Sequence, residues 1–410
     1  ETDVIYRVPD FVGNLFETPD KKDRKYGAGG KLLEDPDCFY HYDDEGNLVF
    51  REFKQLQETG VRFDRKRMEK ERGIRCLATG TGWLYEWSSN GMLKKVIRPD
   101  GRLVEFRYDA LGRRTAKQYF GKVTRWVWDG NVPIHEWSYK ITDMQPDEEE
   151  STPLKEPTKD ITTWVFEAGT FVPTAKIQEG KQYSIVSDYM GTPIQMYDEQ
   201  GNKIWDCTLD IYGKVFTVNK GTEFDCPFRY TGQYFDSETD LYYNRFRYYS
   251  PEMGIYISSD PIGLAGGFNT YAYVKDTNTW VDVLGLSGEL VYQLIRDNKV
   301  VYYGITSRTA LERMAEHGKT KVFDNMEILA DGLTHDQARS IEGALIRQRL
   351  KERADDWSDF DSIKARLDKS GLDNRNRGRI KERWTSENPL DDLRDKIYKK
   401  PKKVKVGCKS

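Results

Sequence analysis

The chain has 410 residues, which is enough for two or three domains and too many for one ordinary core. Its 25 tyrosines, 18 phenylalanines and 10 tryptophans favour strands over helices. The net charge of −3 hides an asymmetry. Residues 287–410 hold 27 basic against 21 acidic residues, a net of +6, and residues 1–286 hold 37 against 46, a net of −9. Only the C-terminal part is therefore expected to meet a polyanion.

Composition also argues against a zinc-binding protein and against a protein with membrane-spanning helices. The five cysteines are scattered and odd in number, and no pair has the spacing of a zinc site, so we expect unpaired thiols. No apolar run approaches the length of a membrane-spanning helix. The sequence opens without an initiator methionine or a signal peptide, and we expect it to be a fragment or a processed product.

A short turn unit recurs between about residues 39 and 250. Gly91, Gly101 and Gly112 lie 10 and 11 residues apart, each in a polar tetrad between alternating apolar residues. Glycine supplies the positive φ that a hairpin turn needs, and the alternation gives a strand with two different faces. Repeated hairpins at this spacing predict an extended β-sheet. The acidic, proline-containing residues 141–161 interrupt the pattern and predict a solvated loop.

Several of these units begin with a Tyr-Asp pair, at Tyr42-Asp43, Tyr108-Asp109 and Tyr197-Asp198. They resemble the YD repeats of Rhs proteins and of insecticidal toxin-complex C subunits, over about residues 35–286. Residues 229–249 are similar to the signature that closes the repeat region in that family. The resemblance implies a mainly β fold in which residues 1–286 form a hollow β-hairpin shell, or cocoon, around a toxin. The alternative is a non-enzymatic repeat protein that binds carbohydrate or a partner.

Two similar phrases stand at the end of the shell region. Asp260 opens Asp-Pro-Ile-Gly-Leu, and Asp282, 22 residues later, opens Asp-Val-Leu-Gly-Leu. Two carboxylates held close together do not both ionise readily, so the pair supplies an acid and a base near neutral pH. Such a pair can activate water against a peptide carbonyl and protonate the leaving nitrogen. Spacing alone favours the alternative that both aspartates are turn and capping residues.

The Rhs resemblance implies self-cleavage by an aspartyl mechanism within a closing region of about residues 229–286. It places the scissile bond between Leu286 and Ser287, and it assigns Arg247 to the arginine that orients or balances the two aspartates. The family usually has a proline after the second aspartate, where this chain has Val283. A lost proline loosens a turn and frees an N–H group, so we expect slower cleavage with both carboxylates retained.

Residues 287–410 are enough for one small α+β domain. Residues 290–295 and 300–305 predict two strands of a hairpin, with a turn at residues 297–298. Helices are predicted at about residues 309–317 and 334–353. Arg313 and His317 are four residues apart and therefore share one face of the first helix.

This layout is similar to that of GIY-YIG nucleases. The resemblance assigns the catalytic positions, in chain order, to Tyr292, Tyr302, Gly304, Arg313, His317, Glu342 and Asn374, with Asn376 as the alternative asparagine. It implies that Glu342 binds one Mg²⁺ or another divalent cation, which prefers oxygen ligands, and that Arg313 clamps the phosphate. A tyrosine would position or activate the attacking water, and Gly304 would let the main chain approach the phosphate. For Glu342 taken singly, a solvated helix face is the alternative.

Two basic clusters are candidates for contacting the phosphates of a nucleic acid: Arg375, Arg377 and Arg379, and then Lys402, Lys403 and Lys405. A solubilising chain end is the alternative for the second cluster. We expect a DNase, and an RNA-cleaving toxin of the same layout is left open because a small basic domain does not separate the two.

The resemblance also implies a biological setting. Rhs effectors serve contact-dependent killing of neighbouring bacteria, commonly through a type VI secretion system. The protein would be made in the bacterial cytoplasm, secreted, and active in the cytoplasm of the target cell. Its expected partners are DNA, a cognate immunity protein, and the secretion spike and chaperone, which would bind an N-terminal part that precedes this sequence.

Overall fold

The chain folds into two compact units, Glu1–Pro261 with Phe268–Gly285, and Ile262–Gly267 with Leu286–Ser410. The computed structural model describes residues 6–57, 60–144, 156–263, 269–274, 276–278, 280–286, 289–297, 299–306, 317, 323–333, 338, 341–342, 345–346 and 397–403. Side chains are described for all of these except residues 289–290, 306, 328, 330–333 and 397–403. The mainly β fold expected from the sequence is confirmed, because the described residues form 26 strands.

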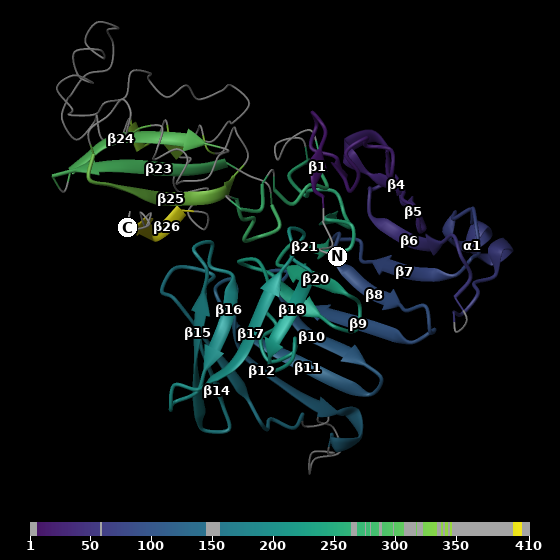
Figure 1. Ribbon diagram of the computed structural model, residues 1–410, viewed down its shortest axis with the longest axis horizontal. Helices are drawn as coiled ribbons and strands as arrows, with labels where there is room; N and C mark the ends of the chain where they lie inside the picture. The colour runs from purple at the N-terminus through teal and green to yellow at the C-terminus, as the bar shows by residue number, and fades with distance from the viewer. Residues whose placement is uncertain are drawn as a thin grey trace, which may run out of the picture. The chain divides into compact units, whose positions relative to one another are not determined.

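The first unit is built on one antiparallel sheet of 16 strands, in which each strand pairs with its neighbours in the sequence (Figure 1). Its strands are β3 (Lys25–Tyr26), β4 (Leu32–Glu34), β5 (Cys38–Tyr42), β6 (Leu48–Phe53), β7 (Gly82–Trp87), β8 (Leu93–Ile97), β9 (Leu103–Tyr108), β10 (Arg114–Tyr119), β11 (Lys122–Asp129), β12 (Val132–Lys140), β13 (Thr162–Phe166), β14 (Pro173–Gln178), β15 (Lys181–Ser187), β16 (Pro193–Tyr197), β17 (Lys203–Leu209) and β18 (Val215–Lys220).

Smaller elements complete this unit. One sheet pairs β1 (Val8–Pro9) with β2 (Leu15–Phe16), and another has the order β19 (Tyr234–Asp236), β20 (Leu241–Asn244), β21 (Arg247–Ser250) and β22 (Ile255–Tyr256). The helix α1 (Arg65–Arg72) lies between β6 and β7, and short 3₁₀ turns lie at η1 (Ala28–Gly30) and η2 (Ile141–Asp143). Residues 156–160 form no strand, which agrees with the predicted loop, and residues 145–155 lie outside the described part of the chain.

Many hairpin turns of the large sheet share one hydrogen-bond pattern. At Asp109, the carboxylate Oδ1 accepts the main-chain N–H groups of Leu111 and Arg113, both at 2.9 Å. Gly112 takes φ +72°, a conformation that favours glycine, and donates its own N–H to the carbonyl of Asp109. The aspartates of three further turns accept in the same way: Asp188, Asp198 and Asp210. These aspartate turns, two of which are the Tyr-Asp units at Asp109 and Asp198, therefore satisfy their own polar groups.

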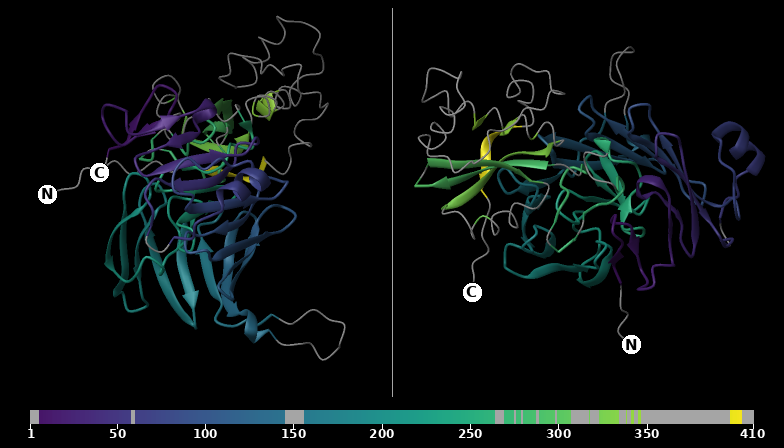
Figure 2. Two further views of the ribbon diagram at one scale, coloured as in Figure 1. Left: turned by 90° about the vertical axis from the view of Figure 1, so that its right-hand side faces the viewer. Right: turned by 90° about the horizontal axis from the view of Figure 1, so that it is seen from above.

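Nearly all side chains of the small sheet β19–β22 are buried. Hydrogen bonds connect this region to both halves of the large sheet, whose strands run from purple to teal in Figure 2. The Tyr249 hydroxyl donates to the carbonyl of Tyr212, in the turn before β18, at 2.7 Å. The main-chain N–H of Leu48, on β6, donates to the carbonyl of Ile257 at 2.8 Å. Its aromatic packing includes a cluster of buried tyrosines, namely Tyr242, Tyr249, Tyr256 and Tyr273.

A buried ion cluster ties β10 to β19. The Arg114 guanidinium donates to Asp236, and the Lys117 ammonium lies 3.0 Å from Asp236 and 2.6 Å from Glu238. Burial raises the pKa of Asp236, but Arg114 and Lys117 outweigh that effect and hold the pKa below its usual value. Removing one partner of such a buried cluster typically costs about 3–5 kcal/mol. The guanidinium also lies within 5.5 Å of the ring centroids of Phe106, Trp126, Tyr234 and Tyr243.

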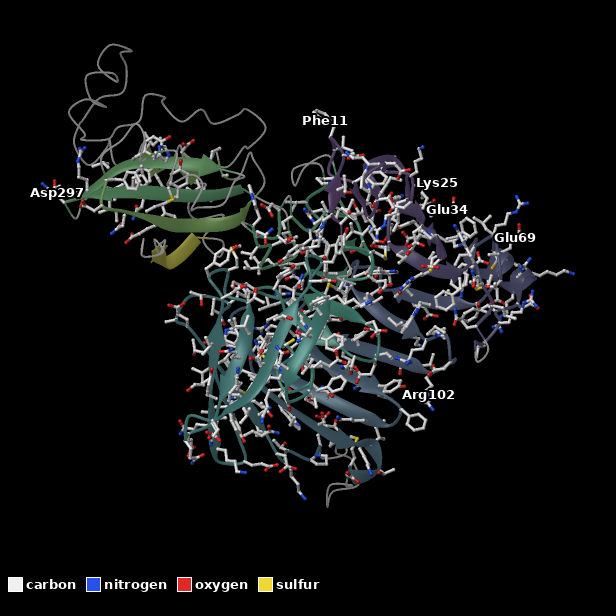
Figure 3. All side chains as sticks on the ribbon, viewed as in Figure 1. Phe11, Lys25, Glu34, Glu69, Arg102 and Asp297 are labelled. Atoms are coloured by element: carbon white, nitrogen blue, oxygen red, sulfur yellow. The ribbon has the colours of Figure 1, made fainter. Side chains whose placement is uncertain are left out.

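The second unit contains an antiparallel sheet in the order β24 (Lys299–Thr306), β23 (Glu289–Arg296), β25 (Asn325–Leu333) and β26 (Ile397–Lys403). The predicted hairpin is confirmed as β23 and β24. Asp297 lies at its tip, with a left-handed φ of +51°, which aspartate tolerates better than most residues (Figure 3). Its main-chain N–H donates to the Asp324 carboxylate at 2.6 Å, which fixes the turn against the start of β25.

The helices predicted for the second unit are described only at scattered positions. His317 is helical, and the rest of the helix predicted at about residues 309–317 lies outside the described residues. Residues 338, 341–342 and 345–346 are helical, in agreement with the helix predicted at 334–353. Within the described part of the chain, no helix is long and apolar enough to cross a membrane. The described cysteines are free thiols, as predicted: Cys38, Cys76, Cys207 and Cys226.

Candidate active sites

The two aspartate phrases meet Arg247 of β21 inside the first unit. One nitrogen of the guanidinium, Nη2, lies 3.2 Å from Oδ2 of Asp260 and 3.1 Å from Oδ2 of Asp282. All three side chains are buried, with at most 7% of the residue exposed. The structure therefore brings together the three charged residues that the sequence assigned to self-cleavage, although Asp260 and Asp282 stand 22 positions apart.

The charges of these three residues are suited to sharing one proton. Among the described residues, the two carboxylates share the guanidinium of Arg247, so two negative charges face one positive charge when both carboxylates are ionised. Uncompensated charge is costly away from water, and one proton on either carboxylate makes the group neutral. The arrangement can therefore hold one carboxylic acid and one carboxylate side by side, which is what acid–base catalysis of peptide hydrolysis requires.

Arg247 also forms a hydrogen bond with the main chain just before the predicted scissile bond, Leu286–Ser287. Its Nε donates to the main-chain carbonyl of Gly285. Its neighbour Phe246 donates its main-chain N–H to the carbonyl of Leu284 at 3.1 Å. The same arginine therefore contacts both aspartates and the segment that precedes the predicted scissile bond. Leu286 is described, and Ser287 lies outside the described residues.

Two glycines allow this segment to pack closely. Gly285 takes φ +67°, and a Cβ there would collide with the main-chain oxygen of Asn244. A Cβ on Gly232 would lie 2.8 Å from the main-chain carbonyl carbon and Cα of Val283. Main-chain atoms of residues 282–285 therefore pack against Gly232 on one side and Asn244 on the other. These contacts hold the segment in place even though Val283 stands where the family usually has a proline.

Two polar residues of this site were not predicted from the sequence. The Tyr256 hydroxyl donates to Oδ2 of Asp282 at 2.9 Å, and the ring centroid lies 3.6 Å from the Arg247 guanidinium carbon. Nδ2 of Asn244 donates to the Tyr256 oxygen at 2.7 Å and to the main-chain carbonyl of Asp282 at 2.8 Å. Asn244 stood inside the closing signature, but no spacing distinguished Tyr256 among the many tyrosines around it.

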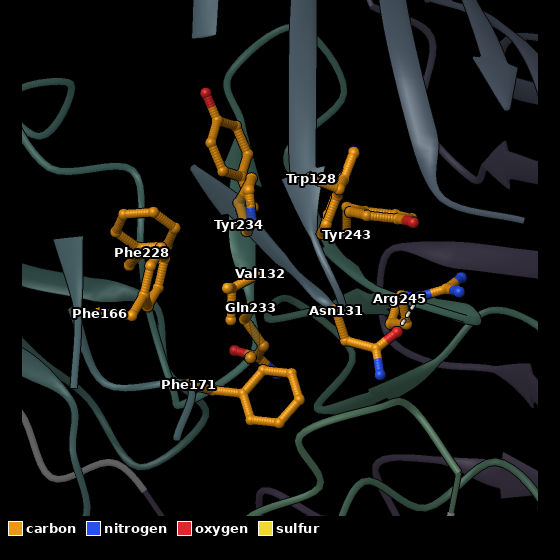
Figure 4. Close-up of a pocket in the computed structure, with 12 residues that line it drawn as sticks. Trp128, Asn131, Val132, Phe166, Phe171, Phe228, Gln233, Tyr234, Tyr243 and Arg245 are labelled. Carbon is orange, nitrogen blue, oxygen red and sulfur yellow. Dashed lines mark hydrogen bonds between the residues drawn. The ribbon is translucent and has the colours of Figure 1, made fainter. Parts of the chain in front are cut away.

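A separate pocket in the first unit is lined mainly by aromatic rings, including Trp128, Phe171 and Tyr243 (Figure 4). Its polar lining consists of Gln233, Asn131 and Arg245, and Arg245 donates to Asn131 at 3.0 Å. The lining holds no carboxylate, histidine or cysteine. It therefore offers no group for acid–base or nucleophilic chemistry near neutral pH.

In the second unit, the structure brings together three residues of the nuclease prediction. The Tyr292 hydroxyl lies 2.7 Å from Nε2 of His317, and both residues are buried. The Tyr302 ring packs against His317 with 4.9 Å between centroids, and it lies 6.1 Å from the Tyr292 ring. The result is a compact group of two phenols and an imidazole on β23, β24 and a helical residue.

Gly304 makes room for this group. It pairs with Tyr292 across the two strands, and a Cβ at this position would lie 2.5 Å from the Tyr292 hydroxyl oxygen and 2.6 Å from Cε1 of Tyr302. Any other residue would displace both tyrosine rings. The sequence assigned this glycine to close approach of a phosphate, and the structure gives it a steric reason that does not depend on a ligand.

The remaining predicted nuclease residues are described in part or not at all. Glu342 is helical and 9% exposed. Lys402 and Lys403 lie on β26, where they pair with Ile328 and Glu327. Among the described strands β26 is the last of its sheet, and lysines and a proline on such a strand discourage pairing with a further chain. Seven predicted positions lie outside the described residues: Arg313, Asn374, Asn376, Arg375, Arg377, Arg379 and Lys405.

A donor set for a magnesium ion was also expected. Among the described residues, no three His, Cys, Asp or Glu side chains gather closely enough to hold a metal. Glu342 nonetheless fits the chemistry of Mg²⁺, which is commonly bound by one or two carboxylates together with water and substrate phosphates.

A long meander of hairpins closed by aspartate turns, together with a buried sheet rich in tyrosine, is typical of a YD-repeat shell protein. The sequence model of the Teneurin YD-shell family matches residues 15–298, and the chain belongs to this family. Probable deoxyribonuclease RhsB of Dickeya dadantii (strain 3937) is 31% identical over 273 residues, which cover 65% of this chain and 17% of that protein. Double-stranded DNA deaminase toxin A of Burkholderia cenocepacia (strain H111) is 30% identical over 321 residues, 73% of this chain and 21% of that protein.

Among solved structures, the crystal structure of TcdB2-TccC3 without its hypervariable C-terminal region matches 61% of this chain and 13% of that chain. The match has 21% identity and a TM-score of 0.40. The chain thus spans about a fifth of the length of the curated relatives it matches.

Proposed function

We propose that this chain is the C-terminal part of a bacterial Rhs toxin, in which a YD-repeat shell encloses a nuclease and cuts it free at Leu286–Ser287. The observation that carries the proposal is the position of Arg247, which binds two buried aspartates and the carbonyl of Gly285, one residue before Leu286. Family membership and relatives named as a deoxyribonuclease and a DNA deaminase toxin support it.

The proposed cleavage is hydrolysis by one water molecule. One carboxylate of the pair Asp260 and Asp282 takes a proton from water as the water oxygen attacks the carbonyl carbon of Leu286. The other delivers its proton to the nitrogen of Ser287 as the C–N bond breaks. The products are a carboxylate on Leu286 and a free amine on Ser287. Arg247 holds the carbonyl of Gly285 and offsets the negative charge of the pair.

The purified chain is therefore expected to run as two polypeptides on a denaturing gel, with the smaller one beginning at Ser287, and to elute from a sizing column as one particle. Salt screens exposed charges over about 3 Å at 1 M, so physical enclosure predicts co-elution that survives 1 M NaCl. Mass spectrometry of both pieces and sizing in low and high salt measure this. A small piece that elutes separately in 1 M NaCl would indicate surface docking and contradict enclosure.

We propose further that residues 287–410 cleave DNA with the help of a bound Mg²⁺. The Tyr292 hydroxyl lies 2.7 Å from Nε2 of His317. In the tautomer with an unprotonated Nε2, His317 can take the tyrosine proton while the phenol oxygen takes one from the attacking water. Glu342 would hold the metal ion, which supplies stabilisation of negative charge on the scissile phosphate. Arg313 is proposed to contact that phosphate, with Asn374 as a further polar group of the site.

DNA is the proposed substrate because both relatives above are named for DNA, although they are named for different reactions. With Mg²⁺ present, the released fragment is expected to nick and linearise supercoiled plasmid and to leave total RNA intact, and EDTA is expected to stop the reaction. Gel electrophoresis of both substrates measures this. Degraded RNA beside intact plasmid would favour the RNA-cleaving alternative, and two intact substrates would favour a non-enzymatic protein that binds carbohydrate or a partner.

The same proposal assigns the partners. A producing bacterium needs an immunity protein that blocks the nuclease. Secretion, through a type VI system, would use a spike and a chaperone that bind a more N-terminal part of the protein. The toxin is then made in the cytoplasm of one bacterium and acts in the cytoplasm of another.

A further inference from the structure

The proposed self-cleavage site contains a fourth polar residue, Tyr256, beside Arg247, Asp260 and Asp282. We infer that Tyr256 is a positioning residue that keeps Asp282 ionised, so that Asp282 is the base of the reaction and Asp260 carries the proton to the leaving nitrogen. The inference rests on the proposed self-cleavage at Leu286–Ser287. It gives the two aspartates different roles, which their similar sequence motifs alone do not distinguish.

The geometry places two donors on one carboxylate oxygen. Oδ2 of Asp282 accepts from the Tyr256 hydroxyl at 2.9 Å and from Nη2 of Arg247 at 3.1 Å. A proton on the other oxygen, Oδ1, would turn Oδ2 into a weaker acceptor and so weaken both hydrogen bonds. Hydrogen bonds to the charged form stabilise that form, and those in which one partner is ionised are among the strongest in proteins. The tyrosine thus favours an ionised Asp282, and the single shared proton then resides on Asp260.

Asn244 fixes the direction of the tyrosine proton. Its Nδ2 carries two hydrogens, one directed to the main-chain carbonyl of Asp282 and the other to the Tyr256 oxygen. A carbonyl only accepts hydrogen bonds, so the amide nitrogen and not the amide oxygen must face it. The tyrosine oxygen therefore accepts from Asn244, and its own proton points to Asp282. Asn244 and Tyr256 are fully buried, so water does not compete for these bonds.

The ring and the hydroxyl of Tyr256 have separate tasks. The ring stacks on the Arg247 guanidinium at 3.6 Å, and the hydroxyl binds Asp282. Substitution by phenylalanine keeps the first contact and removes the second. Among the described residues, Arg247 from β21 and Tyr256 from β22 contact the carboxylate of Asp282, Tyr273 accepts from its main-chain N–H, and Asp260 shares Arg247 with it. Burial, with the charge of Asp282, raises the pKa of both tyrosines well above 10, so both stay protonated between pH 5 and 9.

The test is the pH dependence of cleavage by Tyr256→Phe. Loss of one hydrogen bond to a carboxylate is expected to slow cleavage about 10- to 100-fold near neutral pH, so that uncleaved chain accumulates and can be purified. Removing the donor takes away one hydrogen bond that stabilises the ionised form of Asp282, so a higher pH is needed to restore the base. The cleavage rate, followed on gels at intervals from pH 5 to 9, is therefore expected to increase with pH. A slow rate that does not change with pH would indicate a merely structural tyrosine and overturn the inference.

Tyr249→Phe is the matched control. It removes an equally buried hydroxyl of the same sheet, one that donates to the carbonyl of Tyr212 and not to an aspartate. We expect it to cleave completely, and equally complete cleavage by Tyr256→Phe would overturn the inference. If circular dichroism shows Tyr256→Phe to be unfolded, Asn244→Ala tests the same chain of hydrogen bonds, with the same pH-dependent slowing expected. Asp282→Asn separates the two proposals, because cleavage in that variant would contradict the aspartyl mechanism itself.

Discussion

Asp282→Asn is expected to leave the chain as one full-length polypeptide. The amide has nearly the shape of the carboxylate and can still accept from Arg247 and Tyr256, but it cannot take a proton from water. Acid–base catalysis by a positioned side chain contributes about 10²- to 10⁴-fold, so no cleavage is expected within a purification. Asp260→Asn is expected to behave in the same way because the reaction needs both groups. Intact-mass measurement and a denaturing gel check both variants.

The chain offers a control for these substitutions. Asp276 lies in the same C-terminal segment of the first unit, and its carboxylate accepts from the main-chain N–H and the side-chain amide of Asn278. Asp276→Asn makes the same chemical change away from Arg247, and we expect it to cleave like the unmodified chain. Cleavage that persists in both Asp260→Asn and Asp282→Asn would exclude the aspartyl pair as the source of the reaction.

Glu342→Ala is expected to abolish killing when the chain is expressed in the bacterial cytoplasm. If Glu342 holds the metal ion, its loss removes the charge that stabilises the phosphate during cleavage. Arg313→Ala is expected to raise the barrier by about 2–4 kcal/mol, as for other donors that stabilise developing charge. Growth curves and the integrity of plasmid DNA recovered from the cells measure both effects.

Glu327→Ala is a suitable control for the glutamate. Glu327 lies on β25 of the same unit, where its carboxylate accepts from the amide of Gln293 at 2.9 Å. We expect this variant to kill normally. Unchanged killing by a folded Glu342→Ala variant would exclude the GIY-YIG assignment, whatever the outcome at the self-cleavage site.

Local signals predicted much of the fold. The Tyr-Asp units were predicted because aspartate and glycine build each turn within five residues, as at Asp109 and Gly112. The hairpin β23–β24 was predicted because its strands alternate and Asp297 turns between them. The pairing of β26 with β25 was not predicted, because the lysine run has no alternation and pairs with residues about 70 positions earlier in the chain.

In the candidate sites, too, residues in local motifs were predicted and residues brought in by long-range pairing were not. Asp260, Asp282 and Arg247 were identified because they stand in motifs, and the structure brings them together. Tyr256 and Asn244 were missed because their roles arise from the pairing of β20, β21 and β22 and from the return of the chain at Asp282. The ion pair of Arg114 with Asp236 was likewise not predicted from the sequence, because 122 residues separate its two partners.

The main-chain contacts of residues 282–285 limit what the proposed self-cleavage site could do. The contacts of this segment with Gly232, Asn244 and Arg247 are made by its main-chain atoms on the N-terminal side of Leu286–Ser287, so the proposed cut would break none of them. The new chain end at Leu286 would then stay bound, as a product that does not dissociate. Each molecule would perform one turnover, and the occupied site would be closed to every other peptide. A protease of this kind would pose no hazard to the cell that makes it.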